Sequence, residues 1–285
     1  MIQSMTGYGK AIKQLASKKI TVEIKSLNSK NLDLNARIPS FYRSKELEMR
    51  RKAAKSLVRG KVDFGIYVEI TGEETSSKIN EAAVNEYMKQ LANIVDADDV
   101  ELMKIAIRLP DTLQTEREEI DETEFLSILE AIDEALEAVI TYRSDEGNVL
   151  KADFEMRSNN IESLLKEVII IDPERIEAVK ERLYKAVNDL KEKVDENRFE
   201  QELIYYLEKY DITEEVVRLK NHLNYFTENL NSEESNGKKL GFICQEMGRE
   251  INTIGSKSNY APMQQMVIQM KDELEKIKEQ VLNIL

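Results

Sequence analysis

Apolar and polar residues alternate along three segments near the start of the chain, and this alternation predicts half-buried strands. The segments are KKITVEIKSL (18–27), LDLNARI (32–38) and KVDFGIYVEI (61–70), each with aliphatic or aromatic residues at every second position. Between the last two, residues 41–57 are rich in Lys, Arg, Glu and Ala and predict a helix, which Gly60 follows. The first seventy residues therefore predict a sheet with at least one covering helix.

From about Ile79 onward the pattern is almost entirely helical. We expect the helices to be interrupted at the residues that disfavour helix most, and in the polar loop NSEESNGKK. The expected interruptions lie at Pro110, Gly147, Pro173 and Gly255. Residues 96–124 are acidic and irregular, which predicts a short subdomain or a connection.

The last eighty residues carry three apolar seams in which the spacing alternates between four and three residues. The seams consist of Ile212, Val216, Leu219, Leu223, Phe226 and Leu230, then Leu240, Cys244, Met247, Ile251 and Ile254, then Met263, Val267, Met270, Leu274, Ile277, Val281 and Ile284. Such seams are typical of helices that pack side by side. Three consecutive seams predict an antiparallel helical bundle.

The ends of these helices have recognisable signals. Asp211 stands where an N-cap belongs and Glu214 follows three residues later, as in a capping box. Gly255 can end the second helix, and Pro262 fits the first turn of the third.

The predicted fold class is α+β, with a β-rich N-terminal domain and covering helices, then a long-helix region and the C-terminal antiparallel bundle. We place the N-terminal domain at 1–155 and the helical domain at 156–285. Only 10 Gly and 4 Pro occur in 285 residues, which agrees with a helical majority.

The remaining composition favours a cytoplasmic protein. The start MIQSMTGYGK becomes polar within a few residues, so we expect no signal peptide. No run approaches the roughly 18 apolar residues that a membrane-spanning helix needs. The single cysteine, Cys244, lies in the apolar stretch LGFICQEM and is expected to be buried as a small hydrophobic residue.

The formal net charge of −13 is unevenly distributed along the chain. Residues 1–62 contain 15 Lys and Arg against 4 Asp and Glu, whereas residues 63–142 contain 5 against 21. A basic segment of this kind can form a surface that binds polyanions. Equally, its lysines can solvate one face of the sheet or pair with the acidic segment, and composition does not separate these possibilities.

Several kinds of active site are excluded by residue counts. One histidine and one cysteine cannot supply a His-rich or Cys-based zinc site. Gly7-Tyr8-Gly9 lacks the third glycine of a dinucleotide fingerprint, and the chain has no P-loop motif.

The polar residues beside the first two seams offer another chemistry. Glu215, Arg218 and His222 share one helical face, and Glu246 and Glu250 are i, i+4 neighbours on the next helix. Carboxylates facing an imidazole can hold Mg²⁺ or Mn²⁺, and such an ion can promote phosphodiester cleavage. Nearby cations that could bind phosphate oxygens are Lys238, Lys239, Arg249 and Lys257. Alternatively, Glu246 and Glu250 form structural ion pairs with Arg218 and Arg249, and spacing leaves both options open.

The same stretches carry a family resemblance. The chain contains, in order, MTGYG, VEIKSLNSKNLDL, ARIP, RGKVD, RSDEGNVL, DENRFEQELIYY, KYDITEEVVRLKNHLNYF, GKKLGFICQEMGREINTIGSKS and EQVLNIL. This series resembles the YicC/YloC family over essentially the whole chain. The resemblance implies a cytosolic endoribonuclease that depends on a divalent metal, Mn²⁺ or Mg²⁺, and assembles as a homohexamer.

Carried over by position, the resemblance assigns roles to particular residues. Glu215, His222, Glu246 and Glu250 would ligate the metal, with His222, Glu246, Arg249 and Glu250 as the catalytic set. Arg218, Lys238, Lys239 and Lys257 would contact RNA from the bundle, and Arg37, Arg59 and Lys61 from the N-terminal domain. Gln245 and Asn252 belong to the same implied active region.

The chain departs from the family pattern at three positions. Gly241 stands where an Asp is expected, Gly248 where an Asn is expected, and Lys278 where an Arg is expected. If the missing Asp were a metal ligand, this chain would be impaired or would use a different set. Gly248 inside a helix costs about 1 kcal/mol relative to Ala, which indicates close backbone approach or a bend.

Two other functions fit the same residues. A non-catalytic RNA-binding adaptor would bind RNA without a metal, and its carboxylates would form ion pairs between helices or subunits. A structural, stress-related oligomeric scaffold would bury the basic segment at a subunit interface.

Overall fold

The structure is a computed structural model that describes residues 2–71, 78–114, 121–189, 196–232 and 237–285. The chain divides into two compact units. The sheet unit comprises Tyr8–Ser26 and Asn31–Val139, and the helical unit comprises Met1–Gly7, Leu27–Lys30 and Ile140–Leu285. Sequence and structure agree on an α+β fold with an N-terminal sheet and C-terminal helices, which confirms the predicted fold class.

The sheet has four strands in the order β1-β2-β4-β3. The strands are β1 (Gly7–Gln14), β2 (Lys18–Leu27), β3 (Leu32–Arg37) and β4 (Gly60–Ile70). β3 and β4 pair in parallel, and the connection between them contains the 3₁₀ helix η1 (Ser40–Lys45) and helix α1 (Glu46–Leu57). A helical crossover is what parallel neighbours require. The three predicted strands are confirmed, whereas β1 was not singled out because glycines interrupt its alternation.

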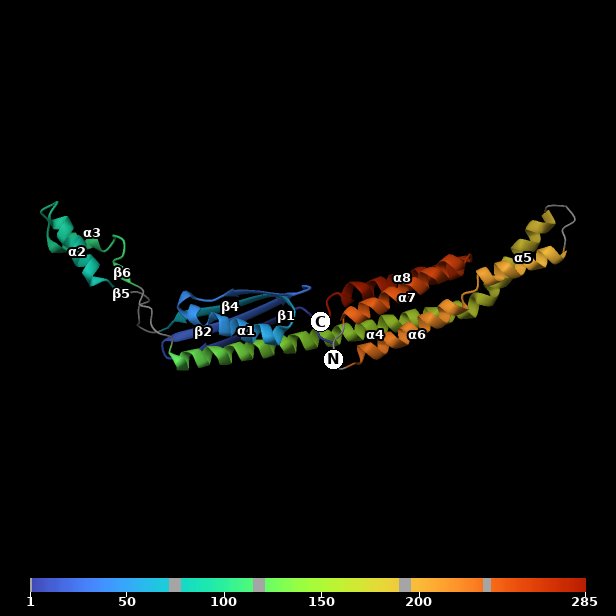
Figure 1. Cartoon of the computed structure of the whole chain (residues 1–285), viewed down its shortest axis with the longest axis horizontal. Coiled ribbons are helices and arrows are strands. Elements are labelled where there is room, and N and C mark those ends of the chain that lie inside the picture. The colour runs from blue at the N-terminus through green and yellow to red at the C-terminus, as the bar shows by residue number, and fades with distance from the viewer. Residues whose placement is uncertain (1, 72–77, 115–120, 190–195, 233–236) are drawn as a thin grey trace. The chain divides into compact units, whose positions relative to one another are not determined.

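One face of the sheet is closed and forms the core of this unit. Its buried side chains pack with those of α1 and the first part of α4 (Glu122–Asp189), which both lie beside the strands in Figure 1. A Cβ added to Gly9 of β1 would lie 2.0 Å from the backbone oxygen of Ala135, so the strand and α4 approach closely there. The other face, which we call the open face, carries the exposed alternate residues of the strands.

The acidic segment predicted to be irregular contains regular elements. β5 (Lys78–Ile79) pairs with β6 (Leu113–Gln114), and α2 (Glu81–Ala92) packs with α3 (Asp99–Ala106). Asn80 and Asp98 cap these helices through side-chain bonds to the amides of Ala83 and Glu101. Of these elements, α3 and β6 lie within 96–124, which therefore contains more helix than its composition indicated, and residues 115–120 lie outside the described residues.

The breaks predicted at Gly147 and Pro173 are wrong, because α4 runs through both residues. A Cβ at Gly147 would lie 2.1 Å from the backbone oxygen of Ile2, so this glycine admits the N-terminal segment against the helix. Around Pro173, Ile171 packs on the core and Arg175 is buried, and this packing overrides the low helix propensity of proline.

The C-terminal helices confirm the predicted antiparallel bundle. They are α5 (Glu196–Lys209), α6 (Thr213–Leu230), α7 (Gly237–Lys257) and α8 (Ala261–Val281). All residues of the three seams are buried except Val216, which is partly buried and packs against the same core. Each large aliphatic residue buried in this way contributes about 1.5–3 kcal/mol relative to exposure. In Figure 1, α6, α7 and α8 lie beside the second part of α4.

The helix ends differ from prediction in two details. Pro262 lies in the first turn of α8, as predicted, but the N-cap of α6 is Ile212 rather than Asp211. The Asp211 carboxylate instead accepts hydrogen bonds from the amide and the hydroxyl of Thr213, at 3.0 and 2.7 Å. The end predicted at Gly255 is wrong, because α7 continues through this residue to Lys257.

The two ends of the chain meet within the helical unit. Ser4 forms an antiparallel bridge with Ile284, and the amide of Met5 donates to the Asn283 carbonyl at 2.8 Å. The C-terminal residues are thus held by the N-terminal segment.

Candidate functional site

The packing of α6 against α7 determines which predicted catalytic residues lie opposite one another along the helix axes. The two helices form a consecutive antiparallel pair, and Lys257 near the end of α7 contacts Glu215 near the start of α6. His222 follows Glu215 by seven residues and Glu250 precedes Lys257 by seven, so His222 and Glu250 are expected at the same level of the pair. The predicted active-region residues thus lie along one helix pair.

Glu215 and Lys257 form a largely buried ion pair. The Lys257 Nζ lies 2.7 Å from Glu215 Oε1, with side-chain exposures of 28% and 7%. The same ammonium donates to the Asp211 carbonyl at 2.8 Å. Glu215 Oε2 is buried with no hydrogen-bond partner among the described residues. Because a lysine already neutralises this carboxylate, Glu215 is the least suited of the four predicted metal ligands, and Lys257 is engaged rather than free for a phosphate.

Arg175 completes this corner of the helical unit and was missed by sequence reasoning. It is buried, its Nε lies 2.7 Å from Asp172 Oδ1, and its Nη1 donates to the Lys257 carbonyl at 3.2 Å. A guanidinium at the end of α7 stabilises the carbonyls that the helix leaves unpaired. Nothing in the charged sequence DPERIEAVKER distinguishes this arginine from its neighbours.

Glu246, Glu250 and His222 are disposed differently. Glu250 is only 4% exposed and forms no ion pair with any described residue, while His222 and Glu246 are half-buried. The described part of the chain contains no group of three His, Cys, Asp or Glu side chains that could hold a metal. The four predicted ligands, Glu215, His222, Glu246 and Glu250, are therefore not gathered into one metal site within the described residues.

The predicted phosphate-binding cations of the bundle have separate environments. Arg218 pairs with Glu214 on the same exposed helix face. Within the described ranges, neither Arg218 nor Arg249 forms an ion pair with Glu246 or Glu250. Arg249 and Lys238 are exposed. The Lys239 Nζ lies 4.8 Å from the ring centroid of Tyr225.

The glycines that depart from the family pattern face α8. A Cβ at Gly248 would lie 3.2 Å from Lys278 Nζ and 3.3 Å from Leu274 Cδ2, which agrees with the close approach expected there. A Cβ at Gly241 would make only an ordinary contact of 3.6 Å with Val281 Cγ1. The position therefore has room for a Cβ.

Cys244 lies fully buried in the seam between these glycines, as predicted. Burial raises the pKa of its thiol to about 12, so the thiol stays protonated and unreactive at neutral pH.

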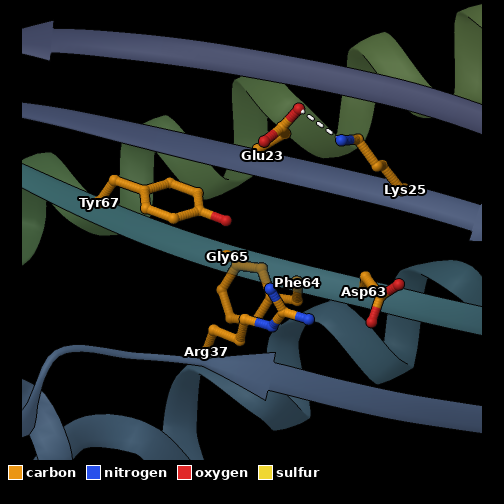
Figure 2. Close-up of a pocket in the computed structure, with 7 residues that line it drawn as sticks. All are labelled: Glu23, Lys25, Arg37, Asp63, Phe64, Gly65 and Tyr67. Atoms are coloured by element: carbon orange, nitrogen blue, oxygen red, sulfur yellow. Dashed lines mark ion pairs between the residues drawn. The ribbon is translucent and has the colours of Figure 1, made fainter.

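The predicted N-terminal RNA contacts lie in the sheet unit. Arg37 and Lys61 are exposed on the open face, and Arg59 is half-buried just before β4. Lys61 lies opposite Asp33 in the β3–β4 register, and Arg37 lies opposite Gly65. A depression of about 220 Å³ on this face is lined by Glu23, Lys25, Arg37, Asp63, Phe64, Gly65 and Tyr67, which are labelled in Figure 2.

Two tyrosines on this face were missed by sequence reasoning. Tyr8 of β1 is 42% exposed and Tyr67 of β4 is 49% exposed. Tyr67 occupies a polar-phase position between Ile66 and Val68, and that misplaced aromatic residue is the signal that could have identified it.

Other lysines of the basic segment form ion pairs with carboxylates of α4. Lys13 contacts Glu130 and Glu134, at 3.2 and 2.8 Å. Lys18 contacts Glu124 at 3.0 Å, and Lys52 contacts Asp133 at 2.7 Å. The basic segment thus pairs in part with the acidic segment, and it leaves a different subset of cations on the open face.

Comparison with family models shows to which class of protein the chain belongs. The model described as the N-terminal region of YicC-like endoribonucleases matches residues 2–152, and the model described as their C-terminal part matches residues 168–285. The chain belongs to the YicC-like endoribonuclease family, which confirms the resemblance found in its motifs.

Two curated relatives are similar along their whole lengths. A protein of Clostridioides difficile named "Probable endoribonuclease YicC" is 34% identical, and one of Haemophilus influenzae with the same name is 28% identical. In both cases the alignment covers all of this chain and all of the relative. Separately, no helix in the described part of the chain is long and apolar enough to cross a membrane.

Proposed function

We propose that this protein is a metal-dependent endoribonuclease that cleaves RNA phosphodiester bonds in the cytoplasm and acts in RNA turnover as a homo-oligomer. The observation that carries the proposal is full-length similarity to two relatives named as probable endoribonucleases, together with matches to both family models. RNA is accordingly the proposed partner.

The proposed roles follow from the α6–α7 geometry. Glu250 is a buried carboxylate without an ion-pair partner in the described chain, so it is the strongest metal ligand, with Glu246 and His222 beside it. A bound Mg²⁺ or Mn²⁺ would neutralise phosphate charge and lower the pKa of a coordinated water. Arg249 is exposed and forms no ion pair with a described residue, so it can hold a phosphate oxygen, and His222 can accept or donate a proton. Lys257 holds Glu215 in position.

Because one chain supplies few ligands, the rest of the coordination sphere would come from waters, from RNA phosphates or from a second copy of the chain. A second copy would make cleavage depend on assembly. Light scattering on the purified protein would give the oligomer number, for which a hexamer is the expectation. A monomer that cleaves RNA would contradict the oligomeric part of the proposal.

The test is cleavage of an end-labelled single-stranded RNA with Mn²⁺ or Mg²⁺, compared with EDTA. Glu250→Gln keeps the size of the side chain and removes its charge, so we expect at least about a hundredfold loss of turnover. Glu228→Gln, an exposed carboxylate on α6, is the matched control and should cleave normally. Unchanged turnover in both Glu250→Gln and Glu246→Gln would reject these assignments.

A second candidate is a non-catalytic RNA-binding adaptor. It is favoured by the lack of three convergent metal ligands in the described part of one chain. RNA binding that persists in EDTA, with no cleavage in any divalent metal, would establish the adaptor instead.

A further inference from the structure

The open face of the sheet presents aromatic residues where a solvated sheet usually presents only polar ones. Tyr8 lies on β1 at one edge and Tyr67 on β4, with β2 between these strands. Both rings are nearly half exposed, and Ile12 beside them on β1 is 49% exposed. The closed face already supplies the core of the sheet unit, so these side chains are not required for burial.

Gly65 gives one of these rings a flat position on the sheet. A Cβ at this residue would lie 2.8 Å from Cε2 and from the hydroxyl oxygen of Tyr67, so the missing side chain is what allows the ring to lie along its own strand. Figure 2 shows Tyr67 extended over the sheet toward Gly65, with the helices behind the strands. The result is a shallow depression floored by Gly65 and bordered by an aromatic ring.

Cations border the same surface. Lys25 on β2 lies 5.8 Å from the ring centroid of Tyr8 and forms the ion pair with Glu23, at 3.1 Å, that Figure 2 marks. Arg37 lies opposite Gly65 on β3. Among the described residues, neither Arg37 nor Lys10 has an ion-pair partner, and both are exposed.

The acidic residues of this face are mostly occupied. Glu23 is held by Lys25, and Glu69 lies 3.4 Å from Lys19. Asp63 accepts a hydrogen bond from Asn35 at 2.9 Å. The groups left to a ligand include two aromatic rings, the exposed cations Arg37, Lys10 and Lys61, and one shallow depression, which complement a flat base attached to a negatively charged backbone.

We propose that the open face binds unpaired bases of single-stranded RNA, with a base stacked on Tyr67 above Gly65 and another on Tyr8, and with Arg37 and Lys10 on phosphates. This inference rests on the proposed function, in which RNA is the substrate, and it adds the surface that selects unpaired segments. A duplex offers its backbone but not the faces of its bases, so stacking discriminates between the two. The surface belongs to the sheet unit, whereas the α6–α7 residues assigned to cleavage belong to the helical unit.

The experiment measures binding of the full-length protein to a fluorescent 12-nucleotide oligouridylate by anisotropy, in EDTA so that cleavage does not interfere. The variants are Tyr67→Ala, Tyr67→Phe and Gly65→Ala, and the last displaces the ring and fills the depression. Tyr142→Ala on α4 is the matched control, because Tyr142 is also 49% exposed. A blunt RNA duplex is the comparison probe, and circular dichroism verifies folding.

Removal of one stacking ring should weaken single-strand binding about tenfold. Tyr67→Phe and Tyr142→Ala should bind as the unmodified protein does, and duplex binding should be unaffected by Tyr67→Ala. Equal binding of the single strand by Tyr67→Ala and the unmodified protein would overturn the proposal, as would equal losses on single strand and duplex. Binding of this kind without cleavage in Mn²⁺ would leave the proposal standing and reject the endoribonuclease assignment instead.

Discussion

The open face of the sheet and the contact between α6 and α7 differ in whether their cations are exposed or held in ion pairs. On the open face, Arg37 and Lys10 are exposed and unpaired among the described residues. In the helical unit, Lys257 is drawn into a largely buried pair with Glu215. Of these three cations, Arg37 and Lys257 are assigned to RNA contacts from the sequence, whereas Lys10 is not singled out there. Their neighbours decide which of them is available, because a charge that is desolvated must be paired.

The largest expected effect comes from adding a methyl group to each face of the sheet, because only on the open face can a flexible side chain move to make room for it. Gly9→Ala on the closed face would place Cβ 2.0 Å from a backbone oxygen of α4, and the backbone must move. We expect a loss of about 3 kcal/mol in the free energy of unfolding, the upper part of the usual overpacking range. Gly65→Ala on the open face displaces only the Tyr67 ring and should cost far less. Urea denaturation of both variants makes the comparison, and equal losses would contradict it.

The next effect concerns two ion pairs made by glutamates of α6, namely Glu215 with Lys257 and Glu214 with Arg218. Lys257→Met leaves the Glu215 carboxylate buried without its partner. Loss of one member of a fully buried pair costs about 3–5 kcal/mol, and since Lys257 is partly exposed we expect about 2 kcal/mol. Arg218→Met breaks an exposed pair with Glu214 and should cost only a few tenths of a kcal/mol. If thermal unfolding ranks Arg218→Met as the more damaging change, the assignment of Lys257 to structure is wrong.

A smaller effect separates the two unusual glycines of α7. Gly241→Ala should stabilise the protein by about 0.5–1 kcal/mol, because alanine favours helix and its Cβ has room. Gly248→Ala should gain less, since its Cβ would press on Leu274 and Lys278. Denaturation midpoints would show the difference, and a greater gain from Gly248→Ala would refute it.

The smallest effect is a dependence of stability on pH. Hydrogen bonds from Thr213 hold the pKa of Asp211 below its ordinary value. As pH falls, the Asp211 carboxyl of the unfolded chain binds a proton before that of the folded chain. Its contribution to the free energy of unfolding is therefore complete above the unfolded pKa of about 3.9 and is lost as pH falls through the lower folded pKa. Because Asp211 is exposed, the contribution is a few tenths of a kcal/mol. Asp211→Asn should reduce the fall in stability between neutral pH and about pH 3, and an unchanged pH profile would argue against it.

The sequence predicted the elements whose pattern is strong and local. Seams spaced by three and four residues identified the helices of the bundle, and two-residue alternation identified β2, β3 and β4. These periods follow directly from helix and strand geometry, so they are readable without a structure. The motifs also identified the family, which the comparisons confirm.

The continuity of α4 could not be read in this way. Gly147 and Pro173 both disfavour helix, yet the helix continues through them. At Gly147 the N-terminal segment lies against the helix, and at Pro173 the neighbouring residues are packed or buried. Residues far apart in the sequence supply these contacts, and they outweigh a propensity of about 1 kcal/mol for glycine and about 3 kcal/mol for proline.

The sequence by itself thus determined which residues could carry charge, bind a phosphate or ligate a metal, because these capacities belong to side-chain chemistry. Only the tertiary structure decided which of them are free to act. In the tertiary structure, ion pairs with α4 engage Lys13, Lys18 and Lys52, and the ring of Tyr67 lies on the open face above Gly65. The physical reason is that availability depends on burial and on partners, and both are set by contacts between distant parts of the chain.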